Sequence, residues 1–169
     1  MAYLYSEVDE KLDYDESERL YKAAIEKGHV GALNNLLSFY LSRSKKNALI
    51  SILNVASELL EYINVELTCI AYLYTGQMTQ YESLLKVLLK NENVSTEFLT
   101  WMIRLKQHKT VMELFDFKSN LKEQNLLLYY AFNIIYSSDD QFKLVIPPEL
   151  LDTVNLIVTD IKEYHENNF

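Results

Sequence analysis

The segment LYKAAIEKGHVGALNNLLSFY, residues 20–40, carries the clearest structural pattern in the chain. Its apolar residues recur three and four positions apart on both sides of Gly28, which is the spacing of amphipathic helices. Glycine readily adopts the left-handed conformation in which many helices end, so Gly28 predicts the end of the first helix. Because the connection between the two helices is short, they must pack antiparallel. The segment therefore predicts a helical hairpin.

The same helical spacing continues along most of the 169 residues. Alternation at every second residue, which would indicate strands, is nearly absent. The one stretch that could be extended is Phe142–Ile146. Asn64 and Ser95 suit helix N-caps, and Gly76 suits a tight turn between helices. We predict about nine helices, at residues 16–27, 30–42, 46–61, 64–75, 79–91, 95–106, 109–116, 120–137 and 148–166, with a short helical turn near Tyr3–Leu12.

The composition also favours an all-α fold. Hydrophobic residues make up 49% and charged residues 24% of the chain, values that are ordinary for a folded protein. The chain has 3 glycines and 2 prolines among its 169 residues. These two residue types therefore make up about 3% of the chain, whereas their average combined share is about 12%. A β-sandwich or barrel needs turn residues at short, regular intervals, and this sequence does not supply them.

Parts of the pattern recur further along the chain. Three pairs of residues lie 34 positions apart: Leu33 and Leu67, Leu36 and Ile70, and Tyr40 and Tyr74. A helical hairpin cannot bury its apolar face alone, but stacking hairpins in a row buries it between neighbours. The recurrence therefore predicts stacked hairpins.

The segment Leu20–Leu36 resembles Sel1-like repeats, a branch of the tetratricopeptide superfamily. Such repeats carry an Ala-Ala pair, then a Gly-His step, then Ala and Leu on the next helix. The corresponding residues here are Ala23, Ala24, Gly28, His29, Ala32 and Leu36. Leu37 stands where the family has a small residue, and residues 42–47 replace its Gly-rich loop. The resemblance implies a right-handed α-solenoid of antiparallel helix pairs.

The predicted domain organisation places the helical repeat domain at residues 1–137. Residues 138–169 would form a linker and a C-terminal capping helix that packs on the same domain. The apolar run Leu126–Phe132 needs burial on every side. We expect the helix at 148–166 to cover it.

The charge balance restricts the partners. The net charge is -8 and the sequence pI is near 4.9, which opposes binding to nucleic acid or to an anionic membrane surface. No signal peptide or apolar run of about 20 residues is visible, and one cysteine fits a reducing compartment, so we predict a cytoplasmic protein. The acidic cluster within Glu7–Glu18 is interpreted as a solvated face or as a docking patch for a basic partner.

Residues for catalysis or metal binding are not grouped in the sequence. His29, His108 and His165 are isolated, and we expect His165 to lie at a solvated helix end. Cys69 lies on an apolar helix face, where a buried and unreactive thiol is expected. We therefore predict no enzyme activity, no cofactor and no bound metal.

The predicted function is non-catalytic binding of a protein or peptide. The chain has 13 tyrosines, and aromatic side chains with a polar tip are enriched at binding surfaces. The resemblance implies that the first helix of each pair lines a concave groove. The candidate partner-binding residues are then Asn35, Tyr40, Glu66, Tyr74, Trp101 and Arg104. The alternatives are a regulatory or sensor domain that switches a partner on peptide binding, and a structural dimerisation module.

Overall fold

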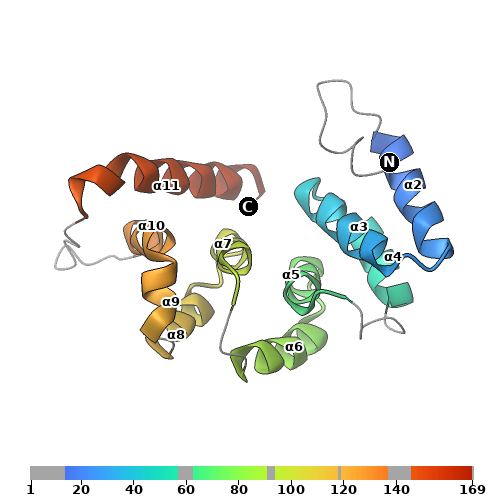
Figure 1. Ribbon diagram of the computed structural model, residues 1–169, viewed down its shortest axis with the longest axis horizontal. Coiled ribbons are helices and arrows are strands. Elements are labelled where there is room, and N and C mark those ends of the chain that lie inside the picture. Colours follow the sequence, from blue (N-terminus) through green and yellow to red (C-terminus); the bar gives the residue numbers. More distant parts are fainter. Residues whose placement is uncertain (1–13, 57–62, 91–93, 118, 137–145, 169) are drawn as a thin grey trace. The chain divides into compact units, whose positions relative to one another are not determined.

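The computed structural model describes residues 14–56, 63–90, 94–117, 119–136 and 146–168 (Figure 1). Every regular element in these residues is a helix, which confirms the predicted all-α class. The predicted helix near Tyr3–Leu12, residues 142–145 and most of the linker lie outside the described residues. The helices are α2 (Tyr14–Glu26), α3 (Val30–Ser42), α4 (Lys46–Ala56), α5 (Val65–Thr75), α6 (Met78–Lys90), α7 (Thr96–Arg104), α8 (His108–Phe117), α9 (Ser119–Gln124), α10 (Leu126–Tyr136) and α11 (Pro148–Asn168).

Contacts divide the chain into two compact units, Met1–Leu88 and Leu89–Phe169. The boundary predicted from the sequence, between residues 137 and 138, lies outside the described residues. Within the first unit α2 packs on α3, α3 on α4 and α4 on α5. Within the second, α7 packs on α8, α8 on α9, α9 on α10 and α10 on α11. Consecutive helices thus pack against one another in both units.

The helix ends follow local sequence chemistry. The side chains of Asn64 and Ser95 accept hydrogen bonds from the backbone N–H of Leu67 and Phe98, which confirms both predicted N-caps. Gly76 ends α5 with φ +83°, a conformation that side-chain-bearing residues rarely adopt. The sequence therefore locates these helix ends correctly.

The predicted helix at 120–137 is wrong, because the chain forms two helices, α9 and α10, that are separated at Asn125. The described residues therefore contain ten helices where about nine were predicted. Asn125 is buried, its side-chain N–H donates to the Leu121 carbonyl, and its side-chain oxygen accepts from the Thr96 hydroxyl. Asparagine side chains compete with the backbone for hydrogen bonds and so favour helix breaks. This contact with α7 is tertiary and cannot be read from helical periodicity.

The first unit has its core on α3, which contacts α2, α4 and α5. Leu36 and Leu37 are 0% exposed, and Leu49 on α4 is equally buried. Asn34 on α3 accepts a hydrogen bond from the backbone N–H of Asn64, just before α5. The exposed positions of α3 form one narrow stripe of small or polar residues, Gly31, Asn35, Ser38 and Ser42, and most of its other residues are apolar and buried.

Glu18 on α2 connects three segments of the first unit. Its carboxylate accepts hydrogen bonds from Lys22, one turn along α2, at 2.7 Å, and from Lys45, just before α4, at 2.9 Å. Burial raises the pKa of Glu18, but hydrogen bonds from Lys22, Lys45 and Tyr40 outweigh burial and lower the pKa to about 2. Burial and the hydrogen bond to Glu18 raise the pKa of Tyr40. The ionised carboxylate therefore stabilises the packing of α2.

We expect Glu18→Gln to destabilise the first unit by about 1–2 kcal/mol at neutral pH, because hydrogen bonds to a charged group are lost. The folded pKa of Glu18 lies below its ordinary value of 4.5, so the unfolded chain binds more protons between these two values. The contribution of Glu18 is present above pH 4.5 and disappears as the pH falls toward 2. Urea unfolding across this range should show a shallower pH dependence in the variant. Exposed Glu26 on α2 provides the control Glu26→Gln; an equal loss there would contradict the assignment.

In the second unit α11 packs across α10 and also contacts α7 (Figure 1). Val154 and Val158 of α11 form a buried cluster with Ala131 of α10, so the expected packing of the C-terminal helix on the apolar run is observed. The expectation that this run is buried on every side is wrong, because Leu126 is 38% exposed. The neighbouring helices cover Leu128, Ala131 and Phe132 of α10 and leave Leu126 and Ile134 accessible.

The last turns of α11 are fixed by polar contacts. His165 Nε2 lies 3.2 Å from the carbonyl oxygen of Ile103, near the end of α7. The same carbonyl accepts a hydrogen bond from the Tyr136 hydroxyl at 3.0 Å. His165 is therefore partly buried against α7, and the prediction of a solvated helix end is wrong for this side chain. Sequence periodicity does not reveal this contact, because Ile103 lies 62 residues earlier.

Candidate functional site

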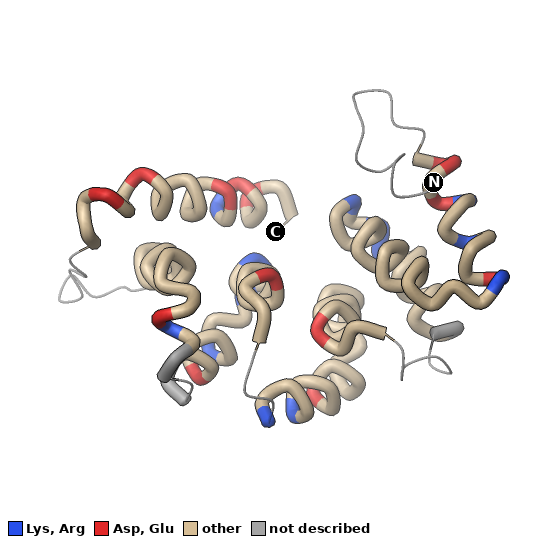
Figure 2. The backbone as a smooth tube through the Cα atoms, in the orientation of Figure 1, with Lys and Arg blue, Asp and Glu red and all other residues tan. Residues whose placement is uncertain are grey.

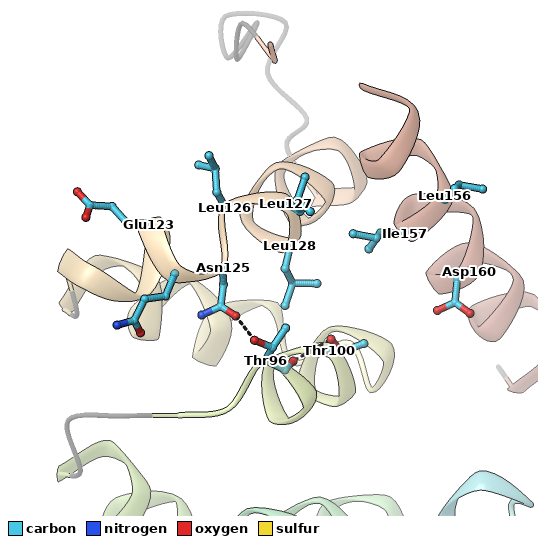
Figure 3. A pocket seen from close by; sticks show the side chains of 11 residues that line it. Thr96, Thr100, Glu123, Asn125, Leu126, Leu127, Leu128, Leu156, Ile157 and Asp160 are labelled. Atoms are coloured by element: carbon cyan, nitrogen blue, oxygen red, sulfur yellow. Dashed lines mark hydrogen bonds between the residues drawn. The ribbon is translucent and has the colours of Figure 1, made fainter. Parts of the chain in front are cut away.

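The second unit contains a groove between the start of α10 and the middle of α11 (Figure 3). Its volume is about 560 Å³. We call it the α10–α11 groove. It is lined by Thr96, Thr100, Glu123, Gln124, Asn125, Leu126, Leu127, Leu128, Leu156, Ile157 and Asp160. The lining thus comes from α7, α9, α10, α11 and the break at Asn125.

The walls of the groove are apolar. The first turn of α10 supplies three consecutive leucines, and α11 supplies Leu156 and Ile157 (Figure 3). Leu156 is 72% exposed and Leu126 is 38% exposed. Exposed leucines on two facing elements leave apolar area in water, where its burial by a ligand would be favourable.

The polar residues from α7 hold the groove together. The Thr96 hydroxyl donates to Asn125 Oδ1, which links the start of α7 to the start of α10 (Figure 3). The Thr100 hydroxyl donates to the Thr96 carbonyl at 2.8 Å. Asn125 also donates to Leu121 at 3.2 Å. The Thr100 bond lies within α7, whereas the Thr96–Asn125 bond fixes the position at which α10 and its leucines begin.

Two carboxylates border the apolar walls. Glu123 is exposed at the end of α9. Asp160 of α11 accepts a hydrogen bond from Arg104 at 2.6 Å, yet its side chain remains 58% exposed. Among the described lining residues these two carry charge, and both are acidic. The groove therefore combines apolar walls with a negative border.

Two of the residues predicted from the sequence, Trp101 and Arg104, lie next to each other on α7, and Arg104 contacts Asp160. The Arg104 guanidinium carbon is 5.5 Å from the Trp101 ring centroid and 5.4 Å from that of Tyr164. Trp101 and Tyr164 meet edge to face at 5.8 Å. Trp101 is 8% exposed, so its ring packs α7 against α11 and offers little surface to a ligand. Arg104 orients Asp160, a lining residue of the groove.

The other four predicted residues lie in the first unit. Asn35 is exposed on α3, while Tyr40 on the same helix is buried at 1% exposure. Glu66 and Tyr74, both on α5, are partly exposed. The buried Tyr40 side chain interacts with Glu18, so it serves the packing of α2. The structure brings Trp101 and Arg104 together and leaves Asn35 and Tyr40 in different environments.

The leucines of the groove were not among the predicted site residues, although the sequence contains a signal for one of them, Leu156. Leu156 lies off the apolar stripe of α11 that includes Val154, Val158 and Ile161. A leucine outside such a stripe must face solvent or a partner. Leu126 gives no comparable signal, because α10 is apolar on all sides and its exposed end depends on the break at Asn125.

The described residues do not bring together groups suited to metal binding. No three His, Cys, Asp or Glu side chains within them lie close enough to hold a metal ion. Burial and the nearby Glu66 raise the pKa of the Cys69 thiol to about 12, so Cys69 is protonated at neutral pH and a poor nucleophile. None of the described helices has both the length and the apolar character required to cross a lipid bilayer.

Comparison of the chain with models of known protein families, with curated proteins and with solved structures finds no match. The resemblance to Sel1-like repeats, which rests on residues 20–36, therefore stays a prediction.

Proposed function

We propose that this protein is a non-catalytic binding module that takes an apolar segment of a partner protein into the α10–α11 groove. The observation that carries the proposal is the pair of exposed leucines, Leu126 and Leu156, on the two walls of one groove. Helix positions that face only solvent are usually polar. Exposed apolar surface in a concave region is typical of a binding site. The volume of the groove is within the range that encloses a ligand or a few side chains.

The architecture supports a binding role. The groove is built from helices held by buried contacts, such as the cluster of Ala131 with Val154 and Val158. A preformed site loses little conformational entropy on binding. A partner segment that packs its own apolar side chains against the groove would remove exposed surface of Leu126 and of Leu156 from water.

The right-handed α-solenoid remains part of this proposal. In the first unit α3 contacts α5, which is the packing expected between successive hairpins of a solenoid. The helices α3, α5 and α7 begin at Val30, Val65 and Thr96, a spacing close to that of tetratricopeptide repeats. An experimental structure in which the hairpins do not progress in a row would contradict this part.

The test is a selection of random peptides of about 12 residues, displayed on phage, against the full chain. We expect the selected peptides to contain several apolar residues. The double substitution Leu126→Asp and Leu156→Asp should weaken their binding by about tenfold or more. The exposed parts of the two leucines together amount to about one side chain, and burial of one leucine contributes about 1.5–3 kcal/mol. Both substitutions should leave the fold intact. Leu126 is exposed in the first turn of α10, where aspartate is favourable, and Leu156 is 72% exposed on α11.

Leu151→Asp is the matched control. Leu151 lies on α11, is 43% exposed and does not line the groove. It should leave peptide affinity unchanged, and circular dichroism should show the same helix content in all variants. The absence of selected peptides, or equal binding to the double variant and the native chain, would overturn the proposed function.

A further inference from the structure

We infer that the segment bound in the α10–α11 groove is basic as well as apolar, with a lysine or arginine flanking its apolar residues. This inference rests on the proposed function and specifies the chemistry of the partner. It is carried by the position of Asp160 and Glu123 at the border of the apolar walls.

The helix that supplies Asp160, α11, is itself acidic. This helix carries five carboxylates and one lysine over Pro148–Asn168, and Figure 2 shows acidic positions along its length. The whole chain has a net charge of -8. A positively charged segment would therefore be attracted to this side of the second unit before it makes contact.

Asp160 is already oriented for a second cationic partner. Arg104 donates to its Oδ2 atom, and the rings of Trp101 and Tyr164 lie against the Arg104 guanidinium. The Asp160 side chain is still 58% exposed, so a ligand ammonium or guanidinium could reach it. A carboxylate that is held in place loses less conformational entropy when it pairs with the ligand.

The negative net charge of the chain disfavours binding of a second copy in the α10–α11 groove. Two chains with a net charge of -8 each repel one another. In a contact through this groove, the acidic α11 of one copy would approach Glu123 or Asp160 of the other. Like charges across an interface disfavour the pairing.

The experiment uses the peptides that the selection yields. We expect Lys and Arg to be enriched beside their apolar residues. Replacing one such residue by glutamine should weaken binding about threefold, and replacing it by glutamate about tenfold, as measured by fluorescence anisotropy. Raising the salt from about 50 to about 300 mM should reduce the difference, because exposed charges are screened.

The variant Glu123→Gln should reduce the preference for lysine over glutamine. Glu149→Gln is the matched control, since Glu149 is exposed on α11 and does not line the groove. Apolar peptides that lack basic residues and bind as tightly, or Glu123→Gln and Asp160→Asn variants that keep the full lysine preference, would overturn the inference and leave the proposed function standing.

Analytical ultracentrifugation of the free protein tests whether a second copy of this chain occupies the groove. We expect a monomer whose sedimentation is the same in the native chain and in the Leu126→Asp, Leu156→Asp variant. A dimer that the double substitution dissociates would show that a second copy fills the groove, and would overturn the inference of a basic partner segment.

Discussion

Leu36→Ala is expected to lower the free energy of unfolding of the first unit by about 3–4 kcal/mol. Leu36 is 0% exposed on α3, the helix that contacts α2, α4 and α5. Removing its branched side chain loses the transfer free energy of the missing carbons and leaves a cavity that rigid neighbours fill only in part. Because domains have total stabilities of roughly 5–15 kcal/mol, this loss is large.

Urea unfolding followed by circular dichroism measures the change, and hydrogen exchange at the amides of α3 locates it. Val87→Ala is the control, because Val87 is 51% exposed on α6 and surface substitutions usually change stability by less than about 0.5 kcal/mol. If Leu36→Ala were as mild as Val87→Ala, α3 would not be the centre of the first unit.

Trp101→Ala is expected to destabilise the second unit by about 3–5 kcal/mol, as is usual for loss of a large buried ring. The ring is 8% exposed, meets Tyr164 of α11 edge to face, and supports Arg104. Its removal takes away one of the contacts that hold the C-terminal part of α11 on α7, together with those of His165 and Asp160. Amides within Pro148–Asn168 should therefore exchange faster with solvent.

Trp101→Phe separates packing from ligand contact, because phenylalanine keeps an aromatic ring against Tyr164. It should retain most of the stability that alanine loses, and it should leave the affinity for selected peptides unchanged. A Trp101→Ala protein with native stability and protection of α11, but with impaired peptide binding, would contradict the structural role and show that Trp101 is a ligand contact.

The first helical hairpin shows how much of the fold follows from sequence. The apolar spacing around Gly28 predicts helices at 16–27 and 30–42, and the structure has α2 at Tyr14–Glu26 and α3 at Val30–Ser42. Asn64, Ser95 and Gly76 act as predicted, because capping and left-handed turns depend on residues within one helical turn. The break at Asn125 could not be predicted in this way, since it involves Thr96 of another helix.

The sequence alone determined the helical class and most helix positions, because periodicity, caps and glycines act over a few residues. It also determined the net charge of -8. Only the tertiary structure decided which apolar and polar residues face one another. Tyr40 and Trp101 were candidates for ligand contact and are buried, while Leu126 and Leu156, 30 residues apart in the chain, both line one groove. Exposure depends on which neighbouring helices cover a side chain, and that arrangement arises from packing across the whole unit.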